Sequence, residues 1–247
     1  MIEYTGVKKS FGEQEVLKGI DLTIKDGETF FVLGKTGAGK TVMIRLLVGL
    51  LHADAGSVKI DGEEVTGLSE DEFQKIRLKC GMVFQHPTLF DSLNIFENVA
   101  FGLRRMGGIS DEDILTKVCD ALERVELDPA ISERMPEELS FGEQKRVGLA
   151  RTLVLSPKYL LYDEPTTGLD PFTASRINEL IRQLNRDLNT TSIVVSHDME
   201  SMRTLADRVG LLWEGDFCFV GTVPEFMASD QPAIIEFKKG IAEKGGA

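Results

Sequence analysis

The sequence lacks a long hydrophobic run and has few cysteines. Its longest apolar stretch, residues 43–51, is interrupted by Arg45 and falls short of a membrane-spanning helix. The amino-terminal residues 1–4 have neither the basic region nor the apolar core of a signal peptide, so we expect none. The cysteines lie far apart, without metal-ligand spacing, which is typical of a reducing compartment; they are Cys80, Cys119 and Cys218.

Positive charge is also scarce. The 28 basic residues are outnumbered by 40 acidic ones, which gives a formal net charge of −12. This charge disfavours nonspecific binding to nucleic acid and direct adhesion to anionic lipid. We therefore predict no nucleic-acid partner, and any membrane contact has to come from a partner protein. The 247 residues, 42% of them apolar, can form one large domain with a substantial core.

A glycine-rich loop lies between an apolar, strand-like run at 29–33 and a helix-like run at 42–47. Its pattern is Gly-x-x-x-x-Gly-Lys-Thr, which aims backbone N–H groups and a helix N-terminus at one point and so attracts phosphate. Lys40 can reach the β- and γ-phosphates, and the Thr41 hydroxyl can ligate Mg²⁺. The predicted ATP-binding residues of this loop are Gly34, Lys35, Thr36, Gly37, Ala38, Gly39, Lys40 and Thr41.

Two adjacent carboxylates end a second apolar run, residues 159–162. An ATPase needs one carboxylate to hold Mg²⁺ and another to activate the attacking water. Asp163 suits the first role and Glu164 suits the second. Adjacent residues at a strand end point in different directions, so the two roles can be separate.

Four further segments narrow the choice among phosphate-loop enzymes. Residues 139–151 resemble the signature segment of ATP-binding cassette (ABC) ATPases, and Gln85 resembles their glutamine loop. Residues 168–170 resemble their aspartate loop, and His197 resembles their switch histidine. The motifs occur in the family's order over nearly the whole chain, so the sequence resembles an ABC ATPase.

This resemblance implies an α/β fold of the P-loop NTPase class. It would have a RecA-like core, an antiparallel β subdomain and an inserted helical subdomain. We expect one ABC ATPase domain over residues 1–247, with the core and β subdomain in 1–92 and 140–247 and the helical subdomain in 93–139.

The resemblance also implies roles for single residues. Gln85 would contact Mg²⁺ and the attacking water, and His197 would hydrogen-bond the γ-phosphate. Ser140 and Gly142 would meet the γ-phosphate held by a second copy of the chain in a head-to-tail dimer. Asp170, in the segment that resembles the aspartate loop, would also be a nucleotide-binding residue.

Phe11 matches the aromatic residue that stacks on adenine in the family. The alternative for Phe11 is a core phenylalanine at a strand end. The signature itself departs from the family's usual Leu-Ser-Gly-Gly-Gln, because Phe141 replaces the first glycine and Glu143 replaces the glutamine. Phe141 limits the backbone and adds bulk beside a phosphate site, which affects the geometry of closure.

Local patterns predict several elements. Short strands are expected at 2–4 and 22–24, and a capping box at 69–72 predicts a helix start. Another helix is expected to open at Ser110, with apolar residues at helical spacing up to Val125. A final hairpin is expected from strands at 209–213 and 217–220.

The transported cargo is the least determined feature. Residues 89–101, which follow Gln85, resemble the permease-docking segment of the ATPase subunit in Mla/Mce-type phospholipid transporters, and 164–171 and 235–242 are similar to that family too. The resemblance implies a separate integral membrane permease, an Mce-type lipid-binding protein and a location on the cytoplasmic face of the inner membrane. Packing inside the helical subdomain is an alternative use of the apolar residues in 89–101.

Three other functions stay open at this point. The chain can serve another ABC importer or exporter, for example one for amino acids. It can be a soluble ABC ATPase acting on DNA or ribosomes, although the coiled-coil or zinc-binding insertions usual in such proteins are missing from the sequence. A non-enzymatic nucleotide sensor is the third, but such a protein would not require Glu164.

Overall fold

The computed structural model describes residues 1–244, with side chains up to residue 240. In this part of the chain the strands form a four-stranded and a six-stranded sheet, in the orders β2–β1–β4–β5 and β10–β9–β3–β8–β7–β6. The smaller sheet is antiparallel and contains β1 (Ile2–Phe11), β2 (Gln14–Ile24), β4 (Ala55–Ile60) and β5 (Glu63–Glu64). The larger sheet contains β3 (Thr29–Leu33), β6 (Cys80–Val83), β7 (Tyr159–Asp163), β8 (Thr191–Ser196), β9 (Arg208–Trp213) and β10 (Asp216–Thr222).

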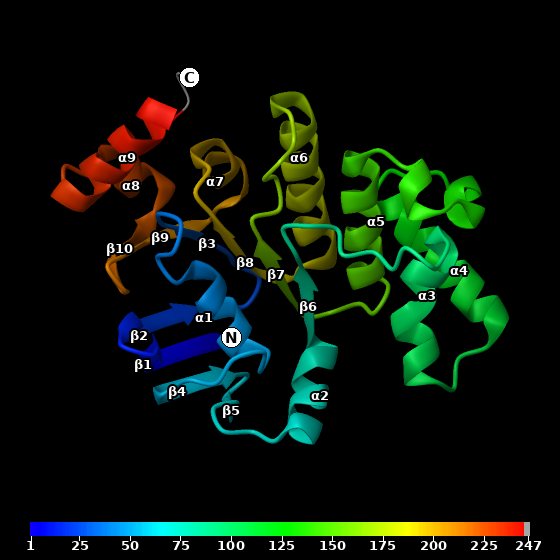
Figure 1. Ribbon diagram of the computed structural model, residues 1–247, viewed down its shortest axis with the longest axis horizontal. Coiled ribbons are helices and arrows are strands. Elements are labelled where there is room, and N and C mark those ends of the chain that lie inside the picture. The colour runs from blue at the N-terminus through cyan, green and yellow to red at the C-terminus, as the bar shows by residue number, and fades with distance from the viewer. Residues whose placement is uncertain (245–247) are drawn as a thin grey trace.

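Helices cover the larger sheet and extend to one side of it (Figure 1). The α-helices are α1 (Lys40–Leu47), α2 (Glu70–Lys79), α3 (Ile95–Met106), α4 (Asp111–Arg124), α5 (Phe141–Leu153), α6 (Pro171–Leu188), α7 (Met199–Leu205), α8 (Val223–Ala228) and α9 (Pro232–Lys244). Short 3-10 helices occupy Pro129–Glu133 and Pro136–Glu138. Within the described residues, no helix is both long and apolar enough to cross a membrane.

The larger sheet is parallel from β6 to β9, and β10 adds an antiparallel edge. Every residue of β3, β7 and β8 is buried, as expected for strands covered on both faces. One hydrophobic core contains α1 residues together with residues of β1, β2 and β4, so α1 lies between the two sheets (Figure 1). A second core joins the other face of the larger sheet to α3, α4, α5 and α6.

The carboxyl ends of the parallel strands meet at one edge of the sheet. Leu33 of β3 pairs with Ser196 of β8, and Asp163 of β7 pairs with Val195 of the same strand. Strand β6 ends at Val83, beside Tyr162. The segments that follow these strands carry the predicted site residues, so the topology brings them to the same edge.

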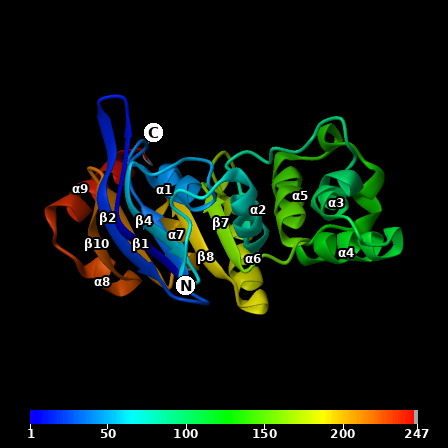
Figure 2. The same cartoon turned by 90° about the horizontal axis from the view of Figure 1, so that it is seen from below.

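The helices α3, α4 and α5 pack against one another at the end of the molecule away from the smaller sheet (Figure 2). Helix α5 belongs to this packing although it begins at Phe141, two residues after the predicted end of the helical subdomain. The division at residues 93 and 139 stays a prediction.

Several local predictions are confirmed. The backbone N–H of Ser69 donates to Glu72 Oε2 at 2.9 Å at the start of α2. Ser110 caps α4, where its Oγ accepts from the Asp113 N–H at 3.1 Å. The predicted hairpin is present as β9 and β10.

The short strands predicted at 2–4 and 22–24 are too short. They belong to β1 and β2, which are 10 and 11 residues long. In β1 the reason is Gly6, which has a φ of 58° and lies in a register irregularity between Tyr4 and Val7. A glycine in a bulge carries the same sequence signal as a glycine in a turn, so the strand continues where the pattern predicts an end.

Candidate active site

The phosphate loop has the backbone that its glycines allow. Gly37 and Gly39 have φ values of 82° and 104°, a region that other residues rarely adopt. A Cβ on Gly39 would also lie 2.8 Å from Cδ2 of Leu17, so the side chain of any other residue would collide with β2. Helix α1 starts at Lys40, directly after Gly39, and its free N–H groups face the loop.

Lys40 is only 6% exposed and bridges the loop to a carboxylate. Its Nζ donates to the carbonyl oxygens of Gly34 at 2.8 Å and Lys35 at 3.2 Å, and lies 3.6 Å from Oε1 of Glu164. Burial lowers the pKa of Lys40, while the negative charges of Glu164 and Asp163 act in the opposite direction. A buried cation is thus held at the loop where phosphate would bind.

Thr41 and Asp163 lie together. The Thr41 Oγ1 donates to Asp163 Oδ1 at 2.7 Å. Burial raises the pKa of Asp163, against the opposing effects of the Thr41 hydrogen bond and the Arg45 charge. Among the described residues no group of three or more acidic, histidine or cysteine side chains could hold a metal. A hydroxyl and one carboxylate suit Mg²⁺, which takes its other ligands from water and substrate phosphates.

Glu164 has an unusual backbone and several donors. Its φ is 51°, which is uncommon for a residue with a side chain and is typical of functional sites. Its backbone N–H donates to Val195 O at 2.9 Å, which ties it to β8. Its Oε2 accepts hydrogen bonds from Ser196 Oγ at 3.1 Å and Thr167 Oγ1 at 3.0 Å.

His197 lies against the same carboxylate, with its Nδ1 3.0 Å from Glu164 Oε2. Burial alone would raise the pKa of Glu164, but the hydrogen bond from His197 and the charges of His197 and Lys40 outweigh burial, and the pKa is lowered. In return, the hydrogen bond to Glu164 raises the pKa of His197 above its usual value. The two residues predicted to act on the γ-phosphate and water are thus in direct contact.

Gln85 is exposed and lies two residues beyond the end of β6. Because Val83 pairs with Tyr162, Gln85 follows β6 at the same level as Glu164 follows β7. This places Gln85 at the edge of the sheet that carries Thr41, Asp163 and Glu164, on the segment predicted to reach Mg²⁺.

Phe11 lies at the end of β1 and is 46% exposed, so the alternative of a core phenylalanine is wrong. Lys9 Nζ lies 5.5 Å from its ring centroid. The partner strand β2 packs Val16 and Leu17 against Gly39 of the phosphate loop. An exposed aromatic ring on a hairpin beside the loop can stack on a base.

Ser140, Gly142 and Asp170 line a different hollow, of about 340 Å³, between the N-termini of α5 and α6. The hollow's lining residues come from segments 126–146 and 168–180, which exclude the phosphate loop. The signature residues are therefore presented at a second surface, as a head-to-tail dimer would require.

The replacement at Glu143 has a visible effect on Ser140. Glu143 Oε2 accepts from the Ser140 backbone N–H at 2.9 Å and from Ser140 Oγ at 2.6 Å. These hydrogen bonds lower the pKa of Glu143, in the manner of a capping box at the start of α5. The signature serine, Ser140, is therefore already hydrogen-bonded to Glu143 before it makes any new contact.

Sequence reasoning missed the side chains that hold Glu164 and its turn. Ser196 and Thr167 donate to the carboxylate, and Lys145 donates to the turn that follows it. The hydroxyl residues stand directly before His197 and Gly168, so their positions beside two motifs were a usable signal. Lys145 gave none, because a lysine in a polar helix segment is normally exposed.

The comparisons with known proteins agree with this geometry. The family described as "ABC transporter" matches residues 17–167. The methionine import ATP-binding protein MetN of Rhizobium johnstonii is 40% identical over 234 residues, which cover 95% of this chain and 64% of that protein. The probable ribonucleotide transport ATP-binding protein mkl of Mycobacterium bovis is 36% identical, over 97% of this chain and 66% of that protein. The chain thus spans just under two thirds of the length of these relatives.

Solved structures show the same fold. The dimeric post-hydrolysis state of the ATP-binding cassette MJ0796, bound to ADP and Pi, has a TM-score of 0.82 at 33% identity and covers 90% of this chain and 99% of that chain. The structure of cbiO1 from Clostridium perfringens, part of the ABC transporter complex cbiONQ, has a TM-score of 0.84 at 29% identity. It covers 99% of this chain and 97% of that chain.

Proposed function

Since this chain belongs to the ABC transporter family, we propose that it hydrolyses ATP to drive transport through a separate membrane permease. The observation that carries the proposal is the group formed by Lys40, Thr41, Asp163, Glu164 and His197 at one edge of the parallel sheet. A cation, a hydroxyl–carboxylate pair and a partly buried carboxylate are the groups that phosphoryl transfer to water requires.

The roles follow from the contacts. Lys40 would leave the Gly34 carbonyl to hold the β- and γ-phosphates, while Thr41 and Asp163 would hold Mg²⁺, with Gln85 reaching the same ion. Bound Mg²⁺ neutralises charge on the phosphates. Glu164 would accept the proton of the attacking water, since its pKa is lowered and the carboxylate is ionised at neutral pH. His197 would donate to the γ-phosphate.

We propose that two copies of the chain act head to tail. Each phosphate loop would then face the hollow of the other copy, which Ser140, Gly142 and Asp170 line. The relative MJ0796 is described as dimeric in two solved structures, which supports the proposal. Phe11 would stack on the adenine of the ATP in its own loop.

The permease would bind in a hollow of about 610 Å³ beside α2 and α3. Leu78 and Met106 line it and are 51% and 55% exposed, so the hollow presents two large apolar side chains to a partner. The predicted docking segment 89–101 is partly exposed and partly buried. Phe90 and Phe101 are exposed, with their tilted rings in contact at a centroid distance of 4.7 Å. The buried residues include Ile95, Val99 and Ala100. Binding of the permease would hold the chain on the cytoplasmic face of the inner membrane.

For the cargo we propose phospholipid, on the resemblance of residues 89–101, 164–171 and 235–242 to Mla/Mce-type ATPases. That cargo implies an Mce-type lipid-binding protein as a further partner. Methionine import is the second candidate, because the 40% identical relative is named for it. The relatives given above are named for methionine import and ribonucleotide transport. The proposal of a phospholipid cargo therefore rests on the sequence resemblance alone.

The experiment is purification of the chain with its permease from native membranes, followed by reconstitution in lipid vesicles. We expect co-purification of a polytopic membrane protein and an Mce-type protein, with movement of labelled phospholipid that requires ATP. ATP-dependent methionine uptake without lipid movement would overturn the phospholipid cargo and keep the transporter. Recovery with ribosomes or DNA and without a membrane protein would overturn the transporter.

A further inference from the structure

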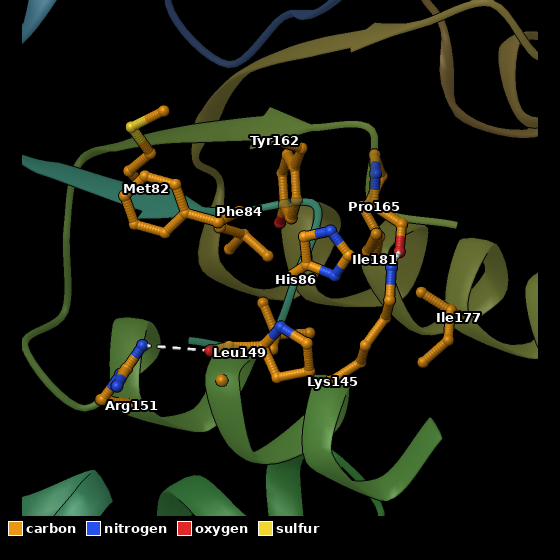
Figure 3. Close-up of a pocket in the computed structure, with 13 residues that line it drawn as sticks. Met82, Phe84, His86, Lys145, Leu149, Arg151, Tyr162, Pro165, Ile177 and Ile181 are labelled. Carbon is orange, nitrogen blue, oxygen red and sulfur yellow. Dashed lines mark hydrogen bonds between the residues drawn. The ribbon is translucent and has the colours of Figure 1, made fainter. Parts of the chain in front are cut away.

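Lys145 is a buried cation on α5 to which the proposed reaction gives no role. It is 7% exposed, and its Nζ donates to the carbonyl oxygens of Pro165 at 2.7 Å and Thr167 at 3.1 Å. Figure 3 shows its side chain extending from α5 toward Pro165. The charged amino group of Lys145 thus donates to two backbone carbonyls of one turn.

That turn, residues 165–168, directly follows Glu164. Thr167 closes it from the other side, since its hydroxyl donates to Glu164 Oε2 at 3.0 Å and its N–H donates to the Glu164 carbonyl at 3.3 Å. Lys145 therefore holds the carbonyl of a residue whose side chain holds the candidate base. A shift of Lys145 would move Thr167, and with it the Glu164 carboxylate.

Phe141 reaches the same turn. It precedes Lys145 by one helical turn, so the two side chains share a face of α5. The Lys145 Nζ lies 5.4 Å from the centroid of the Phe141 ring. A Cβ placed on Gly168 would lie 3.6 Å from Cε1 of Phe141, which places the ring beside the end of the turn. The departure from the family's glycine at this position thus places a second side chain of α5 beside the turn.

The energetics of the lysine favour a fixed contact. Burial lowers the pKa of Lys145 to about 8, although the negative charge of Glu164 opposes the shift. A partly desolvated ammonium is stable only with its acceptors in place, so the two carbonyls and the ammonium fix each other.

We propose that Phe141 and Lys145 form a clasp that holds turn 165–168 and thereby aims Glu164 at the attacking water. Both are positioning residues, and their role rests on the proposed function of Glu164 as the base. The clasp also joins Ser140, the N-cap of α5, to the base. Contact of Ser140 with the nucleotide of a second copy is then transmitted through one helix turn to Glu164.

The test is steady-state ATP turnover and Mg-ATP binding in Lys145→Met, Phe141→Gly and the double variant. We expect kcat to fall about tenfold or more in each single variant, because small misplacement of a catalytic group is costly, with Kd for Mg-ATP changed less than about threefold. The double variant should be no slower than the slower single variant, since either change opens the clasp. Phe141→Tyr keeps the ring and should keep kcat.

Stability is separated from positioning by Leu122→Ala, a cavity variant in the core of α4. It should lower Tm while kcat at 25 °C stays near the wild-type value. If Lys145→Met fails to fold, Lys145→Gln, which keeps a donor, and Phe141→Gly carry the test. Single-variant kcat values within about twofold of wild type, or multiplying effects in the double variant, would overturn the clasp. A wild-type chain without ATP turnover would overturn the proposed function and this assignment with it.

Discussion

The Nδ1 atom of His197 lies 3.0 Å from Oε2 of Glu164. The two residues follow neighbouring strands, β8 and β7, and meet because Asp163 pairs with Val195 in the parallel register. The candidate base and the candidate γ-phosphate sensor are thus in direct contact.

This contact makes stability depend on pH. The pKa of His197 is raised above its ordinary 6.5, so its contribution is complete below that value and is lost as pH rises through the folded-state pKa. The pKa of Glu164 is lowered from 4.5, so its contribution is complete above that value and is lost as pH falls through the folded-state pKa. His197→Ala should therefore lower Tm more at about pH 5.5 than at about pH 8.5. A Tm difference that is constant or grows with pH would contradict the pairing.

Lys40→Met should weaken binding of Mg-ATP about tenfold or more, roughly 1.4 kcal/mol, because it removes the buried cation of the phosphate loop. Isothermal titration calorimetry measures this directly. The matched control is Lys117→Met, an exposed lysine on α4 that lies outside the phosphate loop. If the two variants bind Mg-ATP equally well, Lys40 does not hold the phosphates.

The chain's single tryptophan, Trp213, reports on the loop. Lys35 Nζ lies 4.3 Å from its ring, and the Lys35 carbonyl accepts from Lys40 at 3.2 Å. When Lys40 turns to phosphate, the Lys35 carbonyl loses its hydrogen bond from Lys40. We expect Lys35 to shift against Trp213 as a result, so Mg-ATP should change the emission of Trp213. Lys35→Met should remove most of the change while calorimetry still detects binding. Unchanged emission of the wild type at saturating Mg-ATP would contradict this link.

The α2–α3 hollow can be tested with one charge. Met106→Asp should reduce co-purification of the permease without changing Mg-ATP affinity, because it places a carboxylate in an apolar contact. Leu115→Asp on α4 is the matched control, since Leu115 is 52% exposed and lies outside the hollow's lining. Equal recovery of the permease with both variants would place the docking surface elsewhere.

The phosphate loop, Asp163 and Glu164 could be predicted because each motif is contiguous and directly follows an apolar strand pattern. The family and its fold were predicted from the resemblance of the motifs and their order along the chain, and both are confirmed. The hold on Glu164 could not be predicted in the same way. Thr167 lies only three residues beyond Glu164, but Ser196 reaches Glu164 from β8 and Lys145 reaches the following turn from α5, and only the strand register and the position of α5 bring these two into place.

Other features were hidden for different physical reasons. The Ser140–Glu143 capping box has a readable sequence pattern, but it coincides with the signature segment, where Glu143 stands in place of the family's glutamine. The apolar residues of 89–101 divide between core and surface, and helical spacing alone does not show which face is covered. Cargo depends on the permease, which the ATPase sequence reflects only at a docking surface.

Glu164→Gln tests the central claim most directly. Glutamine keeps the shape of the side chain but cannot accept a proton, so kcat for ATP should fall about a hundredfold or more, roughly 2.7 kcal/mol, with Mg-ATP affinity retained. Glu200→Gln, an exposed carboxylate on α7, should leave turnover unchanged. Turnover of Glu164→Gln is measured beside gel filtration with Mg-ATP, where we expect an ATP-loaded dimer to accumulate. Hydrolysis by Glu164→Gln near the wild-type rate would contradict the assignment of Glu164 as the base.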